Sequence, residues 1–344
     1  MKVLIVFNET KNDNPYVSTL KKALLAESLE VVCSVDDYWN NYREYDIIHF
    51  QWPESLIKGA LNQEQYRKIT EHIDLVKSKC KIISTCHNLE PHYSDNKYKN
   101  LLYEYIYSKS DVIIHLGGYS HDCLKNKLPD VMHQIIPHHV YDDLYKFDLE
   151  KNAARKRLGI PKSANVLLCF GSFRNDEERK MVLKAFKETK LPDRYLLAPG
   201  FFKFRKNIIL GYKSFFKAIY YKFKRVHFVN HFIPDSKVEE YLCAADVLMI
   251  QRCKILNSGN LSLGFLAKKI VVGPETGNVG QILKVTGNPV FNPGDISSVV
   301  NSISAGFEVK NTNLPNENFR YAFENCMTTK VAKMHFDMYI DLIN

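Results

Sequence analysis

The stretch from Asp246 to Gly277 places the strongest constraint on the fold of this chain. It contains an apolar strand over Asp246–Ile250, a polar loop, a helix that begins at Ser258-Gly259, and a second apolar strand over Lys269–Val272. This succession is typical of one βαβ unit of a parallel sheet. Open amides at a helix N-terminus attract anions, and parallel sheets bind ligands beyond the carboxyl ends of their strands. The stretch therefore indicates an anion site, although many βαβ units bind nothing.

The alternation of strands and helices extends to both sides of this unit. In the first half, short apolar strands alternate with helices such as the amphipathic one predicted over Pro15–Glu27. After a predicted linker over Asp142–Lys151 the pattern starts again, and the chain ends in one long helix predicted over Asn316–Ile343. Strands separated by helices pair in parallel through right-handed crossovers. We therefore predict an α/β protein with two Rossmann-like domains, a size that 344 residues allow.

Composition excludes several classes of protein. Apolar runs fall short of the roughly 20 residues that a membrane span needs. The N-terminal run is only five residues long, which predicts a first strand and not a signal peptide. The eight cysteines form no CxxC pair, so we expect reduced thiols in a cytoplasmic protein and no metal site.

The charge of the chain is unevenly distributed. The net charge is +9, yet residues 1–150 contain 17 Lys and Arg against 22 Asp and Glu. The second half is therefore strongly basic, and we expect it to meet something anionic. Nucleotide phosphates, nucleic acid and a lipid surface all satisfy this expectation.

Polar clusters follow several predicted strands of the first half. They occupy His49–Glu54, Cys86–His92 and Pro137–His139, and nine of the twelve histidines lie in residues 1–150. The carboxyl ends of parallel strands meet at one edge of a sheet, so these clusters predict a polar cleft there. A metal site is the weaker interpretation, because no element carries two histidines at ligand spacing.

The segment Phe201–Arg225 interrupts the pattern. It holds eight Lys or Arg, nine aromatic residues and no acid. An aromatic helix face flanked by cations suits the interface of an anionic membrane. A packed helix with a solvated basic edge fits equally well. Single-stranded nucleic acid is a third interpretation, but one helix without an RNA-binding signature argues against it, and we expect no nucleic-acid partner.

A series of stretches resembles the GT-B glycosyltransferases of bacterial surface polysaccharide biosynthesis, in particular the large retaining class that uses nucleotide-sugars. The matching stretches, in order, are Asp46–Glu54, Ser84–His92, Ile135–Tyr145, Cys169–Phe186, Val229–Leu263 and Ala267–Leu283. The resemblance implies two Rossmann-like domains facing a central cleft. Residues 1–145 would bind the acceptor and residues 152–318 the nucleotide-sugar, while residues 319–344 would form a helix that crosses back to the first domain.

The resemblance also implies roles for individual residues. Arg174 would neutralise the developing charge of a diphosphate leaving group, for which a guanidinium fork is well suited. His87 matches a histidine that such enzymes place beside the transferred sugar, and a carboxylate or histidine would act as base if the reaction inverts configuration. The catalytic candidates are His87, Glu54, Glu90 and Asp95. The residues expected to bind the donor are Gly171, Arg174, Arg252, Asn257, Ser258, Gly259, Asn260 and Glu275.

Several positions depart from the pattern of that family. The retaining class usually carries two glutamates eight positions apart, where this chain has Ile255 and Leu263. A lysine expected soon after Arg174 is Glu177, and a later glutamate is Gln281. These departures leave open a non-catalytic sugar-nucleotide-binding subunit. The other alternative is a nucleotide-sugar 2-epimerase, because that class of enzyme shares the fold and needs no acceptor.

The expected substrates and location follow from the resemblance. We expect a nucleotide diphosphate-sugar as donor substrate with no further cofactor, and a saccharide or lipid-linked saccharide as acceptor. The resemblance implies a cytoplasmic hexosyltransferase in exopolysaccharide, capsule or lipopolysaccharide assembly. Contact with the inner face of the cell membrane would be made through residues 201–225.

Overall fold

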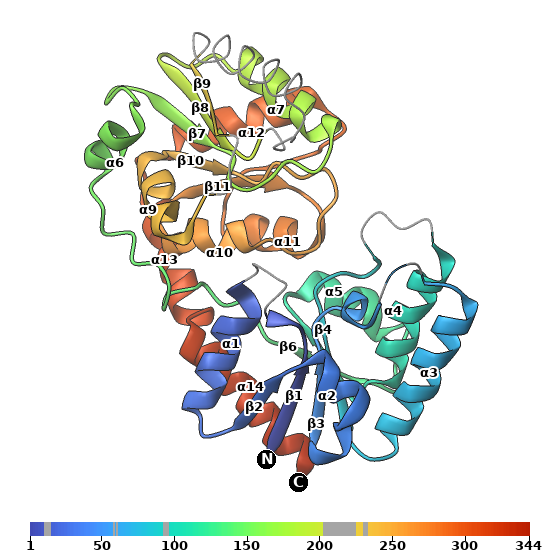
Figure 1. Ribbon diagram of the computed structural model, residues 1–344. Coiled ribbons are helices and arrows are strands. Elements are labelled where there is room, and N and C mark those ends of the chain that lie inside the picture. Colours follow the sequence, from blue (N-terminus) through green and yellow to red (C-terminus); the bar gives the residue numbers. More distant parts are fainter. Residues whose placement is uncertain (10–14, 58, 60, 92–95, 202–224, 230–232) are drawn as a thin grey trace, which may run out of the picture. The chain divides into compact units, whose positions relative to one another are not determined.

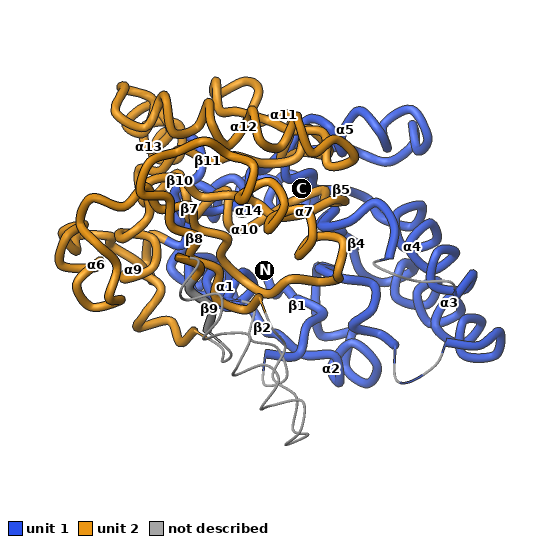
Figure 2. Tube along the Cα trace, turned by 90° about the horizontal axis from the view of Figure 1, so that it is seen from above, with its two compact units in different colours: residues 1–141, 325–344 blue, residues 142–324 orange. Residues whose placement is uncertain are grey.

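A computed structural model describes residues 1–9, 15–57, 59, 61–91, 96–201, 225–229 and 233–344 of the chain. The chain divides into two compact units (Figure 2). The first unit comprises Met1–Tyr141 together with Asn325–Asn344, and the second comprises Asp142–Glu324. The chain thus leaves the first unit once and returns to it at its C-terminus.

The first unit contains a six-stranded parallel sheet in the order β2-β1-β3-β4-β5-β6 (Figure 1). Its strands are β1 (Lys2–Val6), β2 (Glu30–Cys33), β3 (Ile47–Phe50), β4 (Lys81–Cys86), β5 (Val112–His115) and β6 (Met132–Ile135). Its helices are α1 (Pro15–Ala26), α2 (Val35–Asn40), α3 (Gln63–Lys77), α4 (Lys97–Lys109), α5 (Gly118–Lys125) and α14 (Thr328–Ile343), with short 3₁₀ turns η2 (Tyr42–Glu44) and η3 (Pro53–Leu56).

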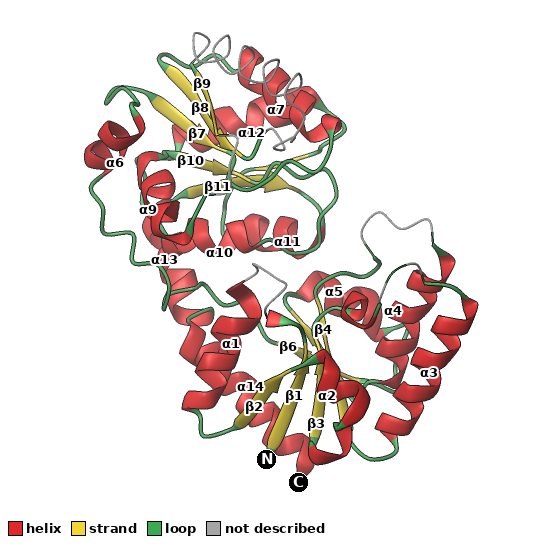
Figure 3. Ribbon diagram, in the orientation of Figure 1, coloured by secondary structure: helices red, strands yellow, loops and turns green. Residues whose placement is uncertain are grey.

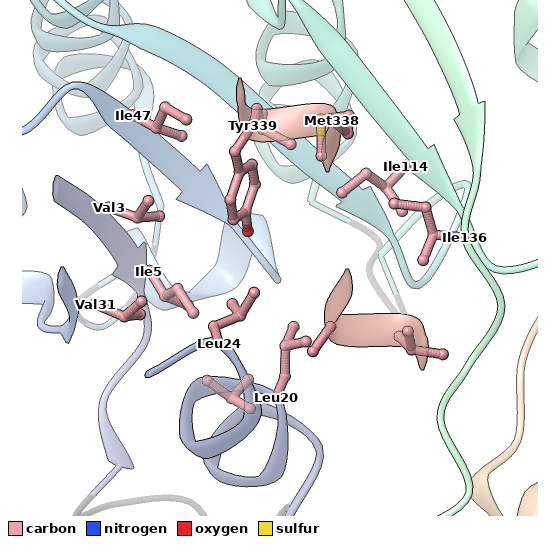
Figure 4. Packing of buried hydrophobic residues seen from close by; sticks show 14 of the residues in the cluster. Val3, Ile5, Leu20, Leu24, Val31, Ile47, Ile114, Ile136, Met338 and Tyr339 are labelled. Carbon is pink, nitrogen blue, oxygen red and sulfur yellow. The ribbon is translucent and has the colours of Figure 1, made fainter. Parts of the chain in front are cut away.

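Helices cover both faces of this sheet because its inner strands, β1, β3, β4 and β5, are buried on both sides. Val3 and Ile5 of β1 pack against α1 and α14, as Figure 4 shows. Leu4 and Val6 of the same strand belong to a second cluster with residues of α3 and α4. Successive side chains of a strand point to opposite faces, so one short apolar run contributes to two cores.

The second unit repeats the architecture with the order β12-β11-β10-β7-β8-β9, again all parallel. Its strands are β7 (Asn165–Leu168), β8 (Arg194–Pro199), β9 (Val226–Val229), β10 (Val247–Met249), β11 (Ile270–Pro274) and β12 (Val290–Phe291). Its helices are α6 (Lys151–Leu158), α7 (Asp176–Glu188), α9 (Asp235–Ala244), α10 (Gly259–Leu266), α11 (Gly277–Val285), α12 (Ile296–Glu308) and α13 (Leu314–Asn325), which Figure 3 distinguishes from the strands by colour.

The two strand orders confirm the prediction of two Rossmann-like α/β domains. In the second unit the order reverses between β7 and β10, and in the first between β1 and β3. Open α/β sheets bind ligands just beyond the carboxyl ends of the strands at such a reversal, which is called a topological switch point. The fold therefore directs attention to the loops that follow these four strands.

The C-terminal region differs from its prediction. One helix was expected over Asn316–Ile343, but the structure has α13 and α14, which are separated at Cys326 and Met327. The carbonyl oxygen of Cys326 accepts a hydrogen bond of 3.0 Å from the amide of Val140, which lies far away in the sequence. This tertiary contact competes with the helical hydrogen bond, and helical periodicity alone does not reveal it.

Candidate functional site

The first candidate site lies at the switch point of the second unit. Strand β7 leads into Gly171, whose φ is 84°. Gly200, with a φ of 78°, follows β8, and a Cβ added to it would lie 2.9 Å from the carbonyl oxygen of Gly171. Real Cβ atoms are not found so close to backbone, so the loop after β7 rests directly on a glycine. This contact fixes where the loop can run.

A buried carboxylate holds the same loop from the other side. Asn175 caps α7 by accepting a hydrogen bond from the amide of Glu178 at 2.9 Å. The Oε2 atom of Glu178 in turn accepts hydrogen bonds of 2.8 Å from the amide of Arg174 and from Nη1 of Arg252. The side chain of Glu178 is only 2% exposed. It therefore joins the loop after β7 to the loop after β10.

This arrangement distinguishes the two predicted cations. The charge of Arg252 is matched by Glu178, so its guanidinium mainly holds the two loops together. Arg174 is half-buried, and no carboxylate of the described residues lies within ion-pair distance of its guanidinium. Arg174 is therefore the residue here with a positive charge to offer to an anion.

The helix that the sequence placed at this edge is α10, and Ser258 is its N-cap. The backbone of Ser258 is extended, and its side chain makes no capping hydrogen bond within the described residues. Gly259 begins the helix. The positive end of the helix dipole and a serine hydroxyl therefore meet at the carboxyl edge of the sheet, an arrangement that favours a bound anion.

Several amide side chains at this edge have structural partners. Nδ2 of Asn260 donates to the carbonyl oxygen of Phe170 at 2.8 Å, and Nε2 of Gln251 donates to the same oxygen at 3.1 Å. Oδ1 of Asn257 accepts a hydrogen bond of 2.7 Å from Nδ2 of Asn278 on α11. These amides position the loops around α10.

The last predicted donor residue, Glu275, lies in the turn between β11 and α11. Its side chain is 43% exposed and forms an ion pair of 3.4 Å with Lys284. The turn itself is tightly packed, since a Cβ added to Gly277 would lie 2.4 Å from the carbonyl oxygen of Ile255. Glu275 thus sits on a turn that is packed against the loop before Ser258.

The second candidate site lies at the carboxyl edge of the first sheet. His87 follows β4, and its Nε2 lies 2.9 Å from Oε1 of Gln51, which follows β3. The indole of Trp52 stacks on the His87 ring with centroids 4.1 Å apart and planes 18° apart. Tyr16 of α1 meets His87 edge-on at 4.8 Å and stacks on His139 at 4.7 Å. The predicted polar clusters therefore converge around His87.

The histidines of this site are neutral at pH 7. Burial is the main reason why the pKa of His87 lies well below its usual range. Electrostatic repulsion from His138, His49 and His139, which would act if these rings were protonated, lowers the pKa further. Burial lowers the pKa of His138 to about 4 and also depresses the pKa of His49 strongly. A neutral imidazole carries one donor and one acceptor nitrogen, so such a ring hydrogen-bonds to hydroxyl groups without contributing charge.

The three remaining catalytic candidates have different surroundings. Glu54 in η3 is half-buried, and its Oε2 accepts a hydrogen bond of 2.6 Å from the hydroxyl of Tyr103. Glu90 is exposed to solvent. Asp95 lies outside the described residues, as do residues 202–224, which make up nearly all of the predicted membrane-binding segment.

Sequence reasoning missed two residues of these sites. Glu178 follows Asn175 by three positions, which is the spacing of a capping box, and this signal could have identified it. Gln51 belongs to the polar cluster His49–Glu54, but its role depends on contacts across the sheet.

The described part of the chain contains no group of three potential metal ligands and no helix long and apolar enough to cross a membrane.

Comparison with solved structures places this fold among known ones. The chain is similar to sucrose-phosphate synthase from Thermosynechococcus elongatus, with 14% identity, a TM-score of 0.75 and 99% of each chain covered. It is similar to Anabaena HepE in complex with UDP-glucose, with 14% identity, a TM-score of 0.69, and 99% of this chain and 100% of that chain covered. It is similar to WaaG, a glycosyltransferase involved in lipopolysaccharide biosynthesis, with 10% identity, a TM-score of 0.64, and 98% and 99% covered.

These similarities establish the class of fold. Both parallel-sheet units have counterparts in these structures, and the chain has the GT-B fold of nucleotide-sugar glycosyltransferases. No protein-family model matches the sequence, and a comparison with curated proteins finds no match.

Proposed function

We propose that this protein is a glycosyltransferase that moves a sugar from a nucleotide diphosphate-sugar to a hydroxyl of a saccharide acceptor. The observation that carries the proposal is the switch point of the second unit. There Arg174 and the N-terminus of α10 lie on the loops after β7 and β10. The proposal is supported by the GT-B fold and by a structure of that fold bound to UDP-glucose.

The proposed chemistry on the donor side is electrostatic. As the bond from the sugar to the diphosphate breaks, negative charge grows on the leaving group. The Arg174 guanidinium and the hydroxyl and amides at Ser258 and Gly259 would stabilise that charge, because they are held in place before the reaction. Glu178 and Arg252 serve this purpose indirectly, since together they hold the loop that carries Arg174.

The proposed acceptor side is the site around His87. A neutral imidazole stacked on Trp52 offers an apolar face and a hydrogen-bonding edge, the combination that a sugar ring requires. If the reaction inverts configuration, Glu54 is our candidate for the base, because it is half-buried and held by Tyr103. Retaining enzymes that this chain resembles carry two glutamates that touch the sugar and the ribose. This chain would have to retain configuration without them, because the corresponding residues are Ile255 and Leu263.

We extend the proposal to a lipid-linked saccharide acceptor in surface polysaccharide assembly, at the cytoplasmic face of the membrane. The similarity to WaaG supports this, as does the basic and aromatic composition of residues 201–225. Replacing the lysines of this segment by glutamate should abolish co-sedimentation with anionic vesicles. Unchanged co-sedimentation would refute the membrane contact and leave the transferase proposal intact.

The main experiment measures binding and turnover with a panel of sugar nucleotides. We expect calorimetry to detect binding of at least one nucleoside diphosphate-sugar, and Arg174→Ala to weaken that binding at least tenfold, because one charge-assisted contact is lost. Arg320→Ala, which removes an exposed arginine of α13, is the matched control and should bind as the unmodified protein does. Failure of every nucleotide-sugar to bind would overturn the proposal.

One observation favours a second function, that of a non-catalytic subunit that binds sugar nucleotides. By the sequence resemblance, Ile255 and Leu263 stand where retaining enzymes carry their paired glutamates, and Leu263 is buried in α10. Under this alternative the panel would show binding sensitive to Arg174→Ala, and no sugar would be released or transferred with any acceptor. Product analysis of the same reactions therefore separates the two functions.

A further inference from the structure

A buried chain of hydrogen-bonding side chains connects the C-terminal helix to His87. The hydroxyl of Tyr339 on α14 lies 2.7 Å from Nδ1 of His49, and Nε2 of His49 lies 3.1 Å from Nε2 of Gln51. Oε1 of Gln51 completes the chain at 2.9 Å from Nε2 of His87. Tyr339 and His49 are fully buried, Gln51 is 1% exposed and His87 is 8% exposed.

The chemistry of Gln51 gives this chain a direction. An amide oxygen can only accept, so Nε2 of His87 carries a hydrogen and donates it to Gln51. An amide nitrogen can only donate, so Nε2 of His49 is an acceptor, and it also lies 2.8 Å from the hydroxyl of Thr85. His49 is neutral and must then carry its hydrogen on Nδ1, from which it donates to Tyr339. Every donor therefore points from His87 towards α14.

We propose that Gln51 is a positioning residue that holds His87 in the tautomer with hydrogen on Nε2, and that Tyr339 of the C-terminal helix anchors the chain that orients Gln51. The Nδ1 atom is then the acceptor nitrogen of the His87 ring. Hydrogen bonds that all run in one direction polarise one another. The complete chain therefore favours this tautomer of His87 more strongly than the hydrogen bond to Gln51 would alone.

The catalytic consequence of a fixed His87 tautomer rests on the proposed function. A sugar hydroxyl would meet a ring with a fixed acceptor instead of a mixture of tautomers, and preorganised groups of this kind contribute to rate because they need no reorganisation. It also assigns a task to the C-terminal residues 325–344, which return to the first unit. Besides covering the sheet, they would set the hydrogen-bonding state of the site.

The test is nitrogen NMR of the full chain labelled with ¹⁵N-histidine, recorded at pH 7.5 without any ligand. Protonated and unprotonated ring nitrogens have well separated shifts, and a His87→Asn variant identifies the His87 signals by their loss. We expect hydrogen on Nε2 of His87 and on Nδ1 of His49. Hydrogen on Nδ1 of His87, or fast averaging of its two tautomers, would overturn the proposal.

Variants test the transmission along the chain. Gln51→Leu removes both contacts, so His87 should become a mixture of tautomers. Gln51→Glu still accepts from Nε2 of His87 and should keep the hydrogen there, while His49 must move its own hydrogen to Nε2, because both carboxylate oxygens can only accept. Tyr339→Phe removes the acceptor of His49, which should shift its hydrogen to Nε2, reverse the Gln51 amide and change the tautomer of His87. An unchanged His87 tautomer in both Gln51→Leu and Tyr339→Phe would contradict the proposal.

The matched control is Tyr38→Phe. Tyr38 is also buried in the first unit, and its hydroxyl has no hydrogen-bond partner among the described residues. This variant should keep the His87 tautomer of the unmodified protein. Because the tautomer is read without substrate, a protein that transfers no sugar can still show the predicted shifts. Once a donor is known, Gln51→Leu should lower kcat about tenfold, Gln51→Glu should restore most of it, and KM for the donor should stay unchanged.

Discussion

Glu178 and Arg252 are 74 residues apart in the sequence, and their side chains lie 2.8 Å apart at the switch point of the second sheet. Both side chains are largely buried, with exposures of 2% and 13%. The carboxylate also accepts a hydrogen bond from the amide of Arg174. The position of the cation proposed to bind the donor therefore depends on an ion pair that does not itself need to touch the donor.

Removing this carboxylate should destabilise the protein and weaken donor binding together. Glu178→Ala removes the buried carboxylate that faces the Arg252 guanidinium, and removal of one member of a buried ion pair typically costs about 3–5 kcal/mol. Glu178→Gln keeps an acceptor for the Arg174 amide and should cost less. Urea denaturation measures the free energy of unfolding of each variant, and calorimetry with the donor measures the loss of affinity.

Glu177→Ala is the control for this pair of measurements. Glu177 is the neighbouring acid on α7, and it is exposed. Surface substitutions usually change stability by about 0.5 kcal/mol or less. If Glu177→Ala and Glu178→Ala lost the same stability and the same donor affinity, the buried ion pair would not be what holds the loop.

Gly200 offers a second test of the loop after β7. Gly200→Ala brings a Cβ to within 2.9 Å of the Gly171 carbonyl oxygen, on a backbone with a φ of 78°. Gly159→Ala is a matched control, because Gly159 has a φ of 66° and nothing within 4 Å of an added Cβ. Left-handed backbone alone costs an alanine about 1–2 kcal/mol.

We therefore expect the free energy of unfolding to fall by roughly that backbone cost in Gly159→Ala. In Gly200→Ala it should fall by about 2 kcal/mol more, because the loop must also move away from the new methyl group. Thermal unfolding measures both losses. Only Gly200→Ala should weaken donor binding. Equal destabilisation of the two variants would show that the loop yields at no cost.

The architecture was predictable from the sequence because local signals specify it. Short apolar runs such as Val3–Phe7 mark strands buried on both faces, and the alternation with helices makes their pairing parallel. The start of a helix at Ser258-Gly259, just beyond a strand, was also predictable. These features depend on neighbours along the chain, and each is visible within a window of a few residues.

The partners of the site residues were not predictable, because they depend on contacts between distant segments. Arg252 was expected to bind phosphate, but whether its charge is matched depends on Glu178 on another element. His49 and Tyr339 are 290 residues apart, and no periodicity links them. The single long helix predicted at the C-terminus is two helices for the same reason, since the contact between Cys326 and Val140 is tertiary.

Stability should decrease as the pH falls below neutrality. His335 is fully buried in α14, and burial lowers its pKa to about 4, whereas an unfolded histidine titrates near 6.5. Between these values the unfolded chain binds a proton that the folded chain does not, so the free energy of unfolding falls with pH, by about 1.4 kcal/mol per pH unit at most for each such histidine. Urea titrations between pH 8 and pH 4.5 measure the slope.

The His335→Phe variant tests the assignment of this slope. The change should make the slope shallower below about pH 6.5, without abolishing it, because burial also depresses the pKa of His49. Tyr38→Phe removes no histidine and should keep the original slope. A slope that His335→Phe leaves unchanged would show that this histidine is protonated in the folded state or not buried there.

The base of an inverting reaction can be identified through the carboxylates of Glu54 and Glu90, which lie in the segments that follow β3 and β4. Glu54 is held by the hydroxyl of Tyr103, at 2.6 Å, whereas Glu90 is exposed. General-base catalysis typically contributes 10²–10⁴-fold, so Glu54→Gln should lower kcat by about that factor while donor binding stays unchanged. Tyr103→Phe should have a smaller effect, because it removes the hydrogen bond that orients the carboxylate and leaves the carboxylate itself. Glu90→Gln is the matched control and should retain nearly full turnover. The reverse result, with Glu90→Gln inactive and Glu54→Gln active, would move the base to Glu90.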